Sequence, residues 1–178
     1  MELEEKQLKR EVIYEGRVIH VYKDDVLLPD GSTSIREVIS HRGGVCIAAR
    51  KEDGSFLMVQ QYRYALGRVF KEFVAGKREE GDEPLERAKA ELQEETGYLA
   101  EHWEDLGAFV PTCGYDNEVI HLYYADDLTF VGQHLDDTEF LNVFTMSLEN
   151  IFREINEGKI QDGKTIILAY KLKEILEK

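Results

Sequence analysis

Residues 76–98, which read GKREEGDEPLERAKAELQEETGY, are the stretch around which the rest of the chain is organised. Pro84 suits the first turn of a helix and Gly97 suits a C-terminal cap, so the second half of this stretch predicts a helix. Asp82 or Glu83 is the candidate N-cap. At about 100° per residue, the apolar side that this helix can bury consists of Leu85, Ala88, Leu92 and Leu99.

An acidic stripe lies beside that apolar side. Glu91, Glu94 and Glu95 are three and four residues apart, so they are neighbours on a helix. Like charges repel, and a divalent cation would turn that repulsion into attraction, because carboxylate clusters suit magnesium or manganese. A run of charges is more often a solvated face. Here, however, a loop with Gly76 and Gly81 leads into the helix N-terminus, an arrangement that favours phosphate binding.

The same stretch resembles the Nudix box, in which Gly is followed after five residues by Glu, and after seven more by Arg-Glu-apolar-any-Glu-Glu-any-Gly-apolar. The positions that match at this spacing are Gly76, Glu91, Leu92, Glu94, Glu95, Gly97 and Tyr98. Asp82 stands at the first glutamate position and keeps its charge, whereas Ala90 replaces the arginine. Arg87 lies four residues before Glu91, so we expect it to reach the acidic stripe in place of that arginine.

The resemblance implies a mixed α/β fold, an α/β/α sandwich with a small β-rich N-terminal module. The expected domains are residues 1–42, a module that helps to build a homodimer in the ADP-ribose pyrophosphatase branch, and residues 43–178, the hydrolase domain. The resemblance also implies bound Mg²⁺ or Mn²⁺. The expected metal ligands are the carboxylates of Glu91, Glu94 and Glu95 and the backbone carbonyl of Ala75, with Glu94 and Glu95 also acting in catalysis.

Further site residues follow from other segments that resemble this branch. Arg63, in Gln-Tyr-Arg, stands where an arginine binds substrate, and its planar fork suits phosphate oxygens; a surface salt bridge is the alternative. In the relatives, the position of Glu72 contacts the nucleotide or orients the box, and Glu118 matches a loop position implied to contact substrate. Glu139, in an acidic loop, matches a carboxylate that binds a metal or activates water, with Asp137 as the second choice. A solvated loop is an equally good interpretation of that segment.

The other elements are predicted from patterning and turn residues. The N-terminal residues 1–10 are charged and are expected to fray or to form a short helical arm. The strands expected before Gly43 are 12–14, 18–28 and, from a weaker alternating pattern, 34–41. After it, we expect a hairpin of 45–49 with 56–64, and the strands 103–109, 119–125 and 141–146. The expected helices are 147–158 and 162–176, the second with a buried side of Ile166, Ile167, Tyr170 and Ile175. Residues 162–165, DGKT, resemble a segment common near the end of this branch.

Composition limits the classes of partner. The 178 residues carry a formal net charge of −14, which disfavours nucleic acids and anionic lipid surfaces. The chain has no apolar run of about 18 residues and no secretory signal at its start, so no membrane partner is expected. Cys46 and Cys113 show no CxxC spacing, which favours free thiols and a cytoplasmic setting.

The predicted reaction is hydrolysis of the diphosphate in ADP-ribose or in a nucleoside diphosphate sugar, giving a nucleoside monophosphate and a sugar phosphate. The substrate is thus a small nucleotide. The alternative is a sensor module of the same fold that binds a nucleotide without cleaving it. Removal of RNA 5′ ends is a weaker interpretation, because the chain lacks a basic surface. Cys113 replaces a proline typical of ADP-ribose enzymes, which leaves the base and sugar open.

Overall fold

The computed structural model of the chain describes residues 3–135 and 139–176, which form two compact units. The first unit contains the residues up to Gly43 together with residues 110–119, and the second contains the remainder. The expected division into domains 1–42 and 43–178 stays a prediction. Patterning gave no sign that residues 110–119 belong with the N-terminal residues.

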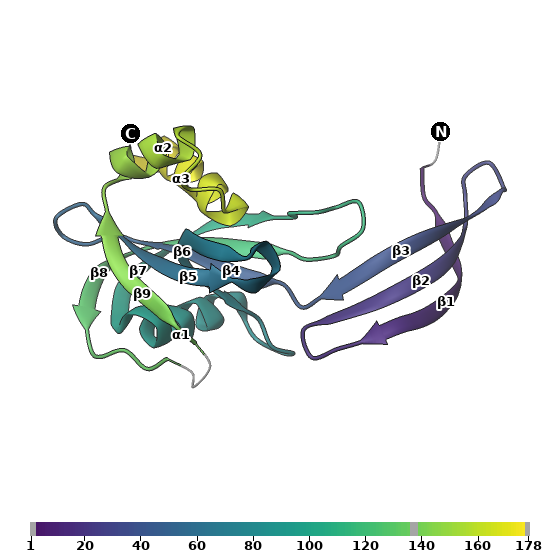
Figure 1. Cartoon of the computed structure of the whole chain (residues 1–178), viewed down its shortest axis with the longest axis horizontal. Helices are drawn as coiled ribbons and strands as arrows, with labels where there is room; N and C mark the ends of the chain where they lie inside the picture. The colour runs from purple at the N-terminus through teal and green to yellow at the C-terminus, as the bar shows by residue number, and fades with distance from the viewer. Residues whose placement is uncertain (1–2, 136–138, 177–178) are drawn as a thin grey trace. The chain divides into compact units, whose positions relative to one another are not determined.

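The N-terminal unit contains a three-stranded antiparallel sheet in the order β1-β2-β3 (Figure 1). Its strands are β1 (Lys6–Glu15), β2 (Ile19–Leu27) and β3 (Thr33–His41). The turn between β2 and β3 is closed by Asp30, whose Oδ1 accepts a hydrogen bond from the N–H of Ser32 at 2.9 Å. The expectation of a frayed or helical arm over residues 1–10 is wrong from Lys6 onwards, because those residues pair with β2 as an edge strand.

Residues 110–119 are held against β3 by hydrogen bonds. The N–H of Ile39 donates to the carbonyl oxygen of Tyr115 at 2.7 Å, and the N–H of His41 donates to Oδ1 of Asn117 at 2.9 Å. These bonds satisfy backbone groups along β3, so a segment from the middle of the chain completes the N-terminal unit.

The second unit is built on a six-stranded mixed sheet in the order β7-β8-β4-β6-β5-β9. Strand β4 pairs with β8 in parallel, and the other four strand pairs of this sheet are antiparallel. The elements are β4 (Gly44–Ala49), β5 (Phe56–Arg63), the short 3-10 helix η1 (Tyr64–Leu66), β6 (Arg68–Lys77), α1 (Pro84–Thr96), β7 (Tyr98–Phe109), β8 (Ile120–Phe130), β9 (Leu141–Met146), α2 (Leu148–Asn156) and α3 (Gly163–Leu176).

Helices cover both faces of this sheet, with α1 on one face and α2 and α3 on the other (Figure 1). On β4, Cys46 and Ala48 belong to the core under α2 and α3, whereas Val45 and Ile47 belong to the core under α1. Successive strand residues point to opposite faces, so an apolar run such as that of β4 is what a strand covered on both sides requires.

The expected hairpin of residues 45–49 and 56–64 is wrong, although both segments are strands. Strand β6 lies between β4 and β5 and pairs with both of them. The turn itself forms as predicted, since the N–H of Lys51 donates to the carbonyl oxygen of Ser55 at 2.8 Å. A tight turn can be recognised from its residues, but it does not determine which strands lie side by side.

Helix α1 has the predicted limits. Pro84 is its first residue, and Gly97 ends it in the left-handed conformation with a φ of 78°. Glu83 is the N-cap, one of the two residues predicted for it, but its side chain makes no hydrogen bond to the helix. Asp82 instead accepts the N–H of Glu79 through Oδ2 at 2.7 Å.

The sequence predicted the buried residues of α1 better than those of α3. On α1, Ala88 and Leu92 are fully buried as expected, whereas Leu99 falls on β7 and is 40% exposed. On α3 the predicted buried side is only partly right. Ile166 and Ile167 are partly buried and pack against the core, whereas Tyr170 is exposed. The fully buried residues of this helix, which were not predicted, are Thr165, Leu168, Ala169 and Leu172. None of the helices within residues 3–135 and 139–176 is long and apolar enough to cross a membrane.

Candidate active site

Arg87 and two glutamates form an ion-pair cluster on α1. Arg87 donates to Oε1 of Glu91 from Nε at 2.9 Å and from Nη2 at 2.5 Å, and Nη2 also donates to Oε2 of Glu94 at 2.9 Å. The predicted contact between Arg87 and the acidic stripe is therefore confirmed, so an arginine pairs with Glu91 and Glu94 although Ala90 occupies the usual arginine position. The Glu91 side chain is 6% exposed and that of Glu94 is 43% exposed.

The backbone of Gly76, at the end of β6, lies directly against Glu91. A Cβ atom placed on Gly76 would stand 1.5 Å from Oε1 of Glu91 and 1.8 Å from its Cδ. A side chain at this position would push the Glu91 carboxylate out of its place, so the glycine is favoured by close approach rather than by an unusual backbone angle. Gly76 thereby lets the carboxylate of Glu91 reach the end of β6.

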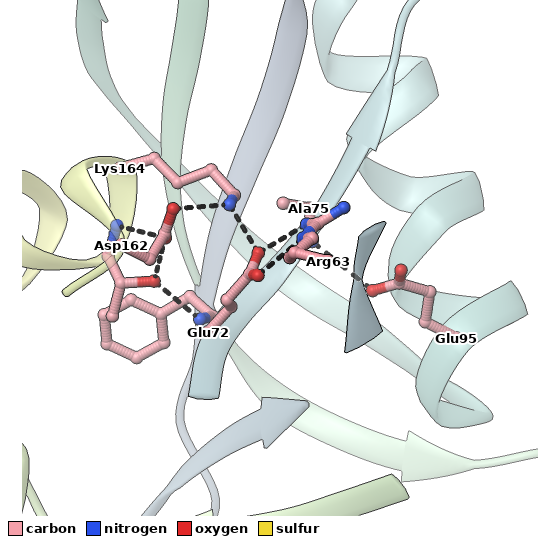
Figure 2. Close-up of polar contacts among 8 residues, drawn as sticks. Arg63, Glu72, Ala75, Glu95, Asp162 and Lys164 are labelled. Atoms are coloured by element: carbon pink, nitrogen blue, oxygen red, sulfur yellow. Dashed lines mark hydrogen bonds and ion pairs between the residues drawn. The ribbon is translucent and has the colours of Figure 1, made fainter. Parts of the chain in front are cut away.

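Glu95 is buried beside the same strand. Its Oε2 accepts a long hydrogen bond of 3.4 Å from the N–H of Ala75 (Figure 2). Burial and the charge of Glu91 raise the pKa of Glu95 to about 8. Burial also raises the pKa of Glu91, although Arg87 opposes that rise. The negative charge of Glu139 also raises the pKa of both carboxyls, so this loop residue lies close enough to act on the pair.

A second network joins β5, β6 and the start of α3 (Figure 2). Arg63 donates to Oε1 of Glu72 from Nε at 2.7 Å and to Oε2 from Nη2 at 2.5 Å. Lys164 donates from Nζ to Oε2 of Glu72 at 2.5 Å and to Oδ1 of Asp162 at 2.8 Å. Burial opposes the charge of Glu72, but the bonds from Arg63 and the charge of Lys164 outweigh it and hold the pKa of Glu72 below its ordinary value.

The parts played by Asp162 and Lys164 in this network were missed from the sequence. Lys164 and Glu72 are 92 residues apart, and no periodicity relates a helix to a strand at that separation. The one available signal was the DGKT segment at residues 162–165, which resembles a family segment but does not itself indicate a contact.

Two of the predicted site residues are not placed with these networks. Glu118 belongs to the N-terminal unit, where its Oε1 lies 3.2 Å from Nδ1 of His41. Asp137 lies outside the described residues. Cys113 is an exposed free thiol, and Cys46 is a buried one.

No ready-made metal cluster of three His, Cys, Asp or Glu side chains occurs in the parts of the chain that the structure describes. The carboxylates of the stripe have separate partners instead. Arg87 binds Glu91 and Glu94, and the N–H of Ala75 binds Glu95. Gathering these carboxylates around one ion therefore requires them to exchange at least some of these bonds.

Residues 40–168 match the family profile described as NUDIX domain, which spans well over half of the chain. The chain belongs to the Nudix family. In this Nudix chain, residues 5–39 match a further profile described as nucleoside diphosphate sugar hydrolase N-terminal domain. The resemblance carried by the box residues is thus confirmed.

Several relatives of the Nudix chain are similar over most of their length. An ADP-ribose pyrophosphatase of Bacillus subtilis (strain 168) is 38% identical over 179 residues, covering 98% of this chain and 97% of the relative. The methanol dehydrogenase activator of Bacillus methanolicus is 40% identical over 171 residues, covering 95% and 92%. A GDP-mannose pyrophosphatase of Yersinia enterocolitica serotype O:8 is 31% identical over 164 residues, covering 84% of each.

A solved structure supports the Nudix fold. The crystal structure of an ADP compounds hydrolase aligns with a TM-score of 0.88 over 99% of this chain and 97% of the other, at 19% identity. The expected fold class, mixed α/β with a β-rich N-terminal module, is confirmed. The expected enzyme class is confirmed as well: the chain is a Nudix pyrophosphohydrolase that acts on nucleoside diphosphates linked to a further group. Nudix enzymes in general use divalent metals.

Proposed function

We propose that this Nudix enzyme hydrolyses the diphosphate of ADP-ribose or of a nucleoside diphosphate sugar, releasing a nucleoside monophosphate and a sugar phosphate. The names of its relatives support this substrate class. The observation that carries the site is the burial of Glu91 and Glu95, one turn apart on α1 and against Gly76 and Ala75 of β6. Two buried like charges are costly unless a cation joins them.

The cation is Mg²⁺ or Mn²⁺, held by the carboxylates of Glu91, Glu94 and Glu95 and by the carbonyl oxygen of Ala75. These are hard oxygen donors of the kind that such ions prefer. The raised pKa values of Glu91 and Glu95 support the fit, because a divalent ion would stabilise the ionised form that burial disfavours.

Each further residue has a role that its surroundings support. When bound, the ion lowers the pKa of water and offsets charge on the phosphoryl oxygens. Arg63 holds the diphosphate; its Nε and Nη2 bind Glu72, which fixes the orientation of the guanidinium. Glu139 takes the proton of the attacking water, since its charge acts on Glu91 and Glu95. Glu118 contacts the nucleotide.

The enzyme works as a cytoplasmic homodimer on a small nucleotide, without a nucleic-acid or membrane partner. The net charge of −14 supports the exclusion of nucleic acids, because a polyanion would be repelled wherever no basic patch opposes the overall field.

A substrate panel tests this function directly. The purified chain is incubated with ADP-ribose, GDP-mannose, a UDP-sugar and a dinucleoside polyphosphate, with and without Mg²⁺, and the products are separated by chromatography. We expect cleavage of ADP-ribose or of a sugar nucleotide that requires Mg²⁺ and falls by at least about 100-fold in Glu95→Gln. The matched control is Glu86→Gln, since Glu86 lies on the same helix and pairs with Lys89.

Two outcomes of the panel contradict the proposal. Tight nucleotide binding by the wild-type chain with no product would identify a sensor module instead of an enzyme. Cleavage that persists unchanged in Glu95→Gln would place the chemistry away from the carboxylate pair.

The similarity to the methanol dehydrogenase activator supports a second candidate function. In this case the chain would raise the activity of a partner alcohol dehydrogenase. The test is an assay of a methanol dehydrogenase with and without the chain. Stimulation that disappears in Glu95→Gln would link the activation to the hydrolase site, and no stimulation would remove this candidate.

A further inference from the structure

The first turn of α3 is joined to strand β6 by buried polar contacts. The hydroxyl of Thr165, which is fully buried, accepts the N–H of Phe73 at 2.9 Å and donates to Oδ2 of Asp162 at 2.6 Å. Oδ2 of Asp162 also accepts the N–H of Thr165 at 2.9 Å. These bonds fix the beginning of the helix next to Glu72, the residue that precedes Phe73 on β6 (Figure 2).

Lys164 extends from this fixed turn to the carboxylate that holds Arg63. Its side chain is 14% exposed, and that of Glu72 is 1% exposed. Oε2 of Glu72 receives both Nζ of Lys164 and Nη2 of Arg63, each at 2.5 Å. The side chain of Arg63 remains 39% exposed, so Arg63 is the member of the network that a ligand in solution can reach.

The charges of this network balance. Arg63 and Lys164 carry two positive charges, and Glu72 and Asp162 carry two negative charges. Removal of the Lys164 charge would leave a net negative group around Arg63. The guanidinium would then be the only cation beside Glu72, with the charge of Asp162 nearby, and an arriving anion would meet a weaker positive field.

We propose that Lys164 is a positioning residue for substrate binding, which neutralises part of the charge of Glu72 from behind so that the guanidinium of Arg63 stays oriented and its positive charge is less offset toward the diphosphate. Lys164 acts through Glu72 and does not itself need to touch the substrate. This inference rests on the proposed role of Arg63 as the group that holds the diphosphate.

The role makes the last helix part of the binding site. Lys164 and Thr165 belong to α3, which follows the six strands and the helices α1 and α2 of the unit along the chain. A rotation or shift of α3 would therefore be transmitted to Arg63 through Lys164 and Glu72. Even a small shift of Arg63 would matter, because a misplacement of about 1 Å can change a reaction rate by about 100-fold.

The test compares Lys164→Met, Lys164→Arg, Arg63→Ala and the double variant Arg63→Ala/Lys164→Met. Lys171→Met, on the same helix but outside this network, is the matched control. The kcat and KM for ADP-ribose are measured with Mg²⁺, the affinity for inorganic pyrophosphate is measured by calorimetry, and the thermal unfolding midpoint is measured for every variant.

We expect Lys164→Met to raise KM and to weaken pyrophosphate binding by about tenfold each, with kcat changed less than about threefold. Lys164→Arg keeps the charge and should recover at least half of the loss on a logarithmic scale. In the Arg63→Ala background, Lys164→Met should add little, because the residue through which it acts has gone. Lys171→Met should leave all three quantities unchanged.

The inference is overturned if Lys164→Met weakens binding by the same factor with and without Arg63, since the two residues would then act independently. It is also overturned if Lys164→Met lowers the unfolding midpoint but leaves KM and pyrophosphate affinity intact, which would make the residue merely structural. If the wild-type chain cleaves no nucleotide, the proposed function fails, but the pyrophosphate titrations of the same variants still decide the role of Lys164.

Discussion

At the scale of single residues, the position of one positive charge distinguishes this chain from the box pattern. Ala90 stands where an arginine is expected, and Arg87, one turn earlier, makes the contacts to Glu91 and Glu94. Helical spacing was enough to predict this contact, because both partners lie on one continuous helix. The close approach of Gly76 to Glu91 could not be predicted in the same way, because it depends on how β6 packs against α1.

The first prediction concerns this relocated arginine. Arg87→Ala should lower kcat/KM for the preferred substrate by at least about tenfold, because Glu91 and Glu94 lose the cation that holds them. Lys89→Ala is the matched control, since Lys89 pairs with Glu86 at 2.7 Å, away from the two glutamates. Arg87→Ala/Ala90→Arg should recover part of the loss. Equal and small effects of Arg87→Ala and Lys89→Ala would refute the compensation.

The second prediction follows from the pKa of about 8 at Glu95. Without divalent ions, the folded chain keeps a proton on Glu95 between pH 4.5 and 8, whereas the unfolded chain has lost it. The free energy of unfolding should therefore fall as pH rises through this window, by up to about 1.4 kcal/mol per pH unit from this group. Below pH 4.5 and above pH 8 the contribution of Glu95 should level off.

Urea unfolding at a series of pH values without divalent ions checks this prediction. Glu95→Gln should flatten the fall, because a glutamine has no proton to lose. Addition of Mg²⁺ should stabilise the wild-type chain more at pH 9 than at pH 6, since the ionised carboxylate binds the cation. The same slope in the wild-type chain and in Glu95→Gln would show that other groups cause the fall.

At the scale of elements, local signals predicted where most helices and strands begin and end, but not how they pair. Pro84 and Gly97 gave the limits of α1, and Ser147 caps α2 as expected by accepting the N–H of Asn150 through Oγ at 3.3 Å. The pairing of 45–49 with 56–64 was wrong because β6 inserts between the two strands. Strand order depends on contacts between distant segments, which turn chemistry does not encode.

The third prediction tests the buried side of α3, of which the apolar pattern identified only a part. The helix is apolar on several sides, so periodicity alone did not select the buried one. Leu172→Ala removes a fully buried side chain and should lower the free energy of unfolding by about 2–5 kcal/mol. Tyr170→Ala, at a residue that is 51% exposed but touches the ring of Phe152, should cost about 1 kcal/mol.

Chemical denaturation of both variants distinguishes the two sides of α3. A larger loss of stability in Tyr170→Ala than in Leu172→Ala would restore the side that was predicted from the sequence.

At the scale of the whole molecule, the positive charge at the candidate site is local. The chain as a whole is acidic, with a net charge of −14, yet Arg63, Arg87 and Lys164 are each paired with glutamates of the two networks. The box motif and the acidic stripe were predictable because their residues are close in sequence. The assembly of β5, β6 and α3 around Glu72 was not, because it joins segments separated by 92 residues.

The last prediction concerns assembly and arises from the N-terminal sheet. Every residue of β1 is exposed, although the strand carries Leu8, Val12, Ile13 and Tyr14, each at least 55% exposed. An exposed edge strand with apolar side chains favours association with another chain, and a second copy would cover it in a homodimer.

Sedimentation at micromolar concentration should therefore give twice the chain mass. Val12→Lys should shift the equilibrium toward the monomer, whereas Gln7→Lys, which adds the same charge on the same strand without removing an apolar side chain, should do so less. A wild-type chain that sediments as a monomer under these conditions would rule the homodimer out.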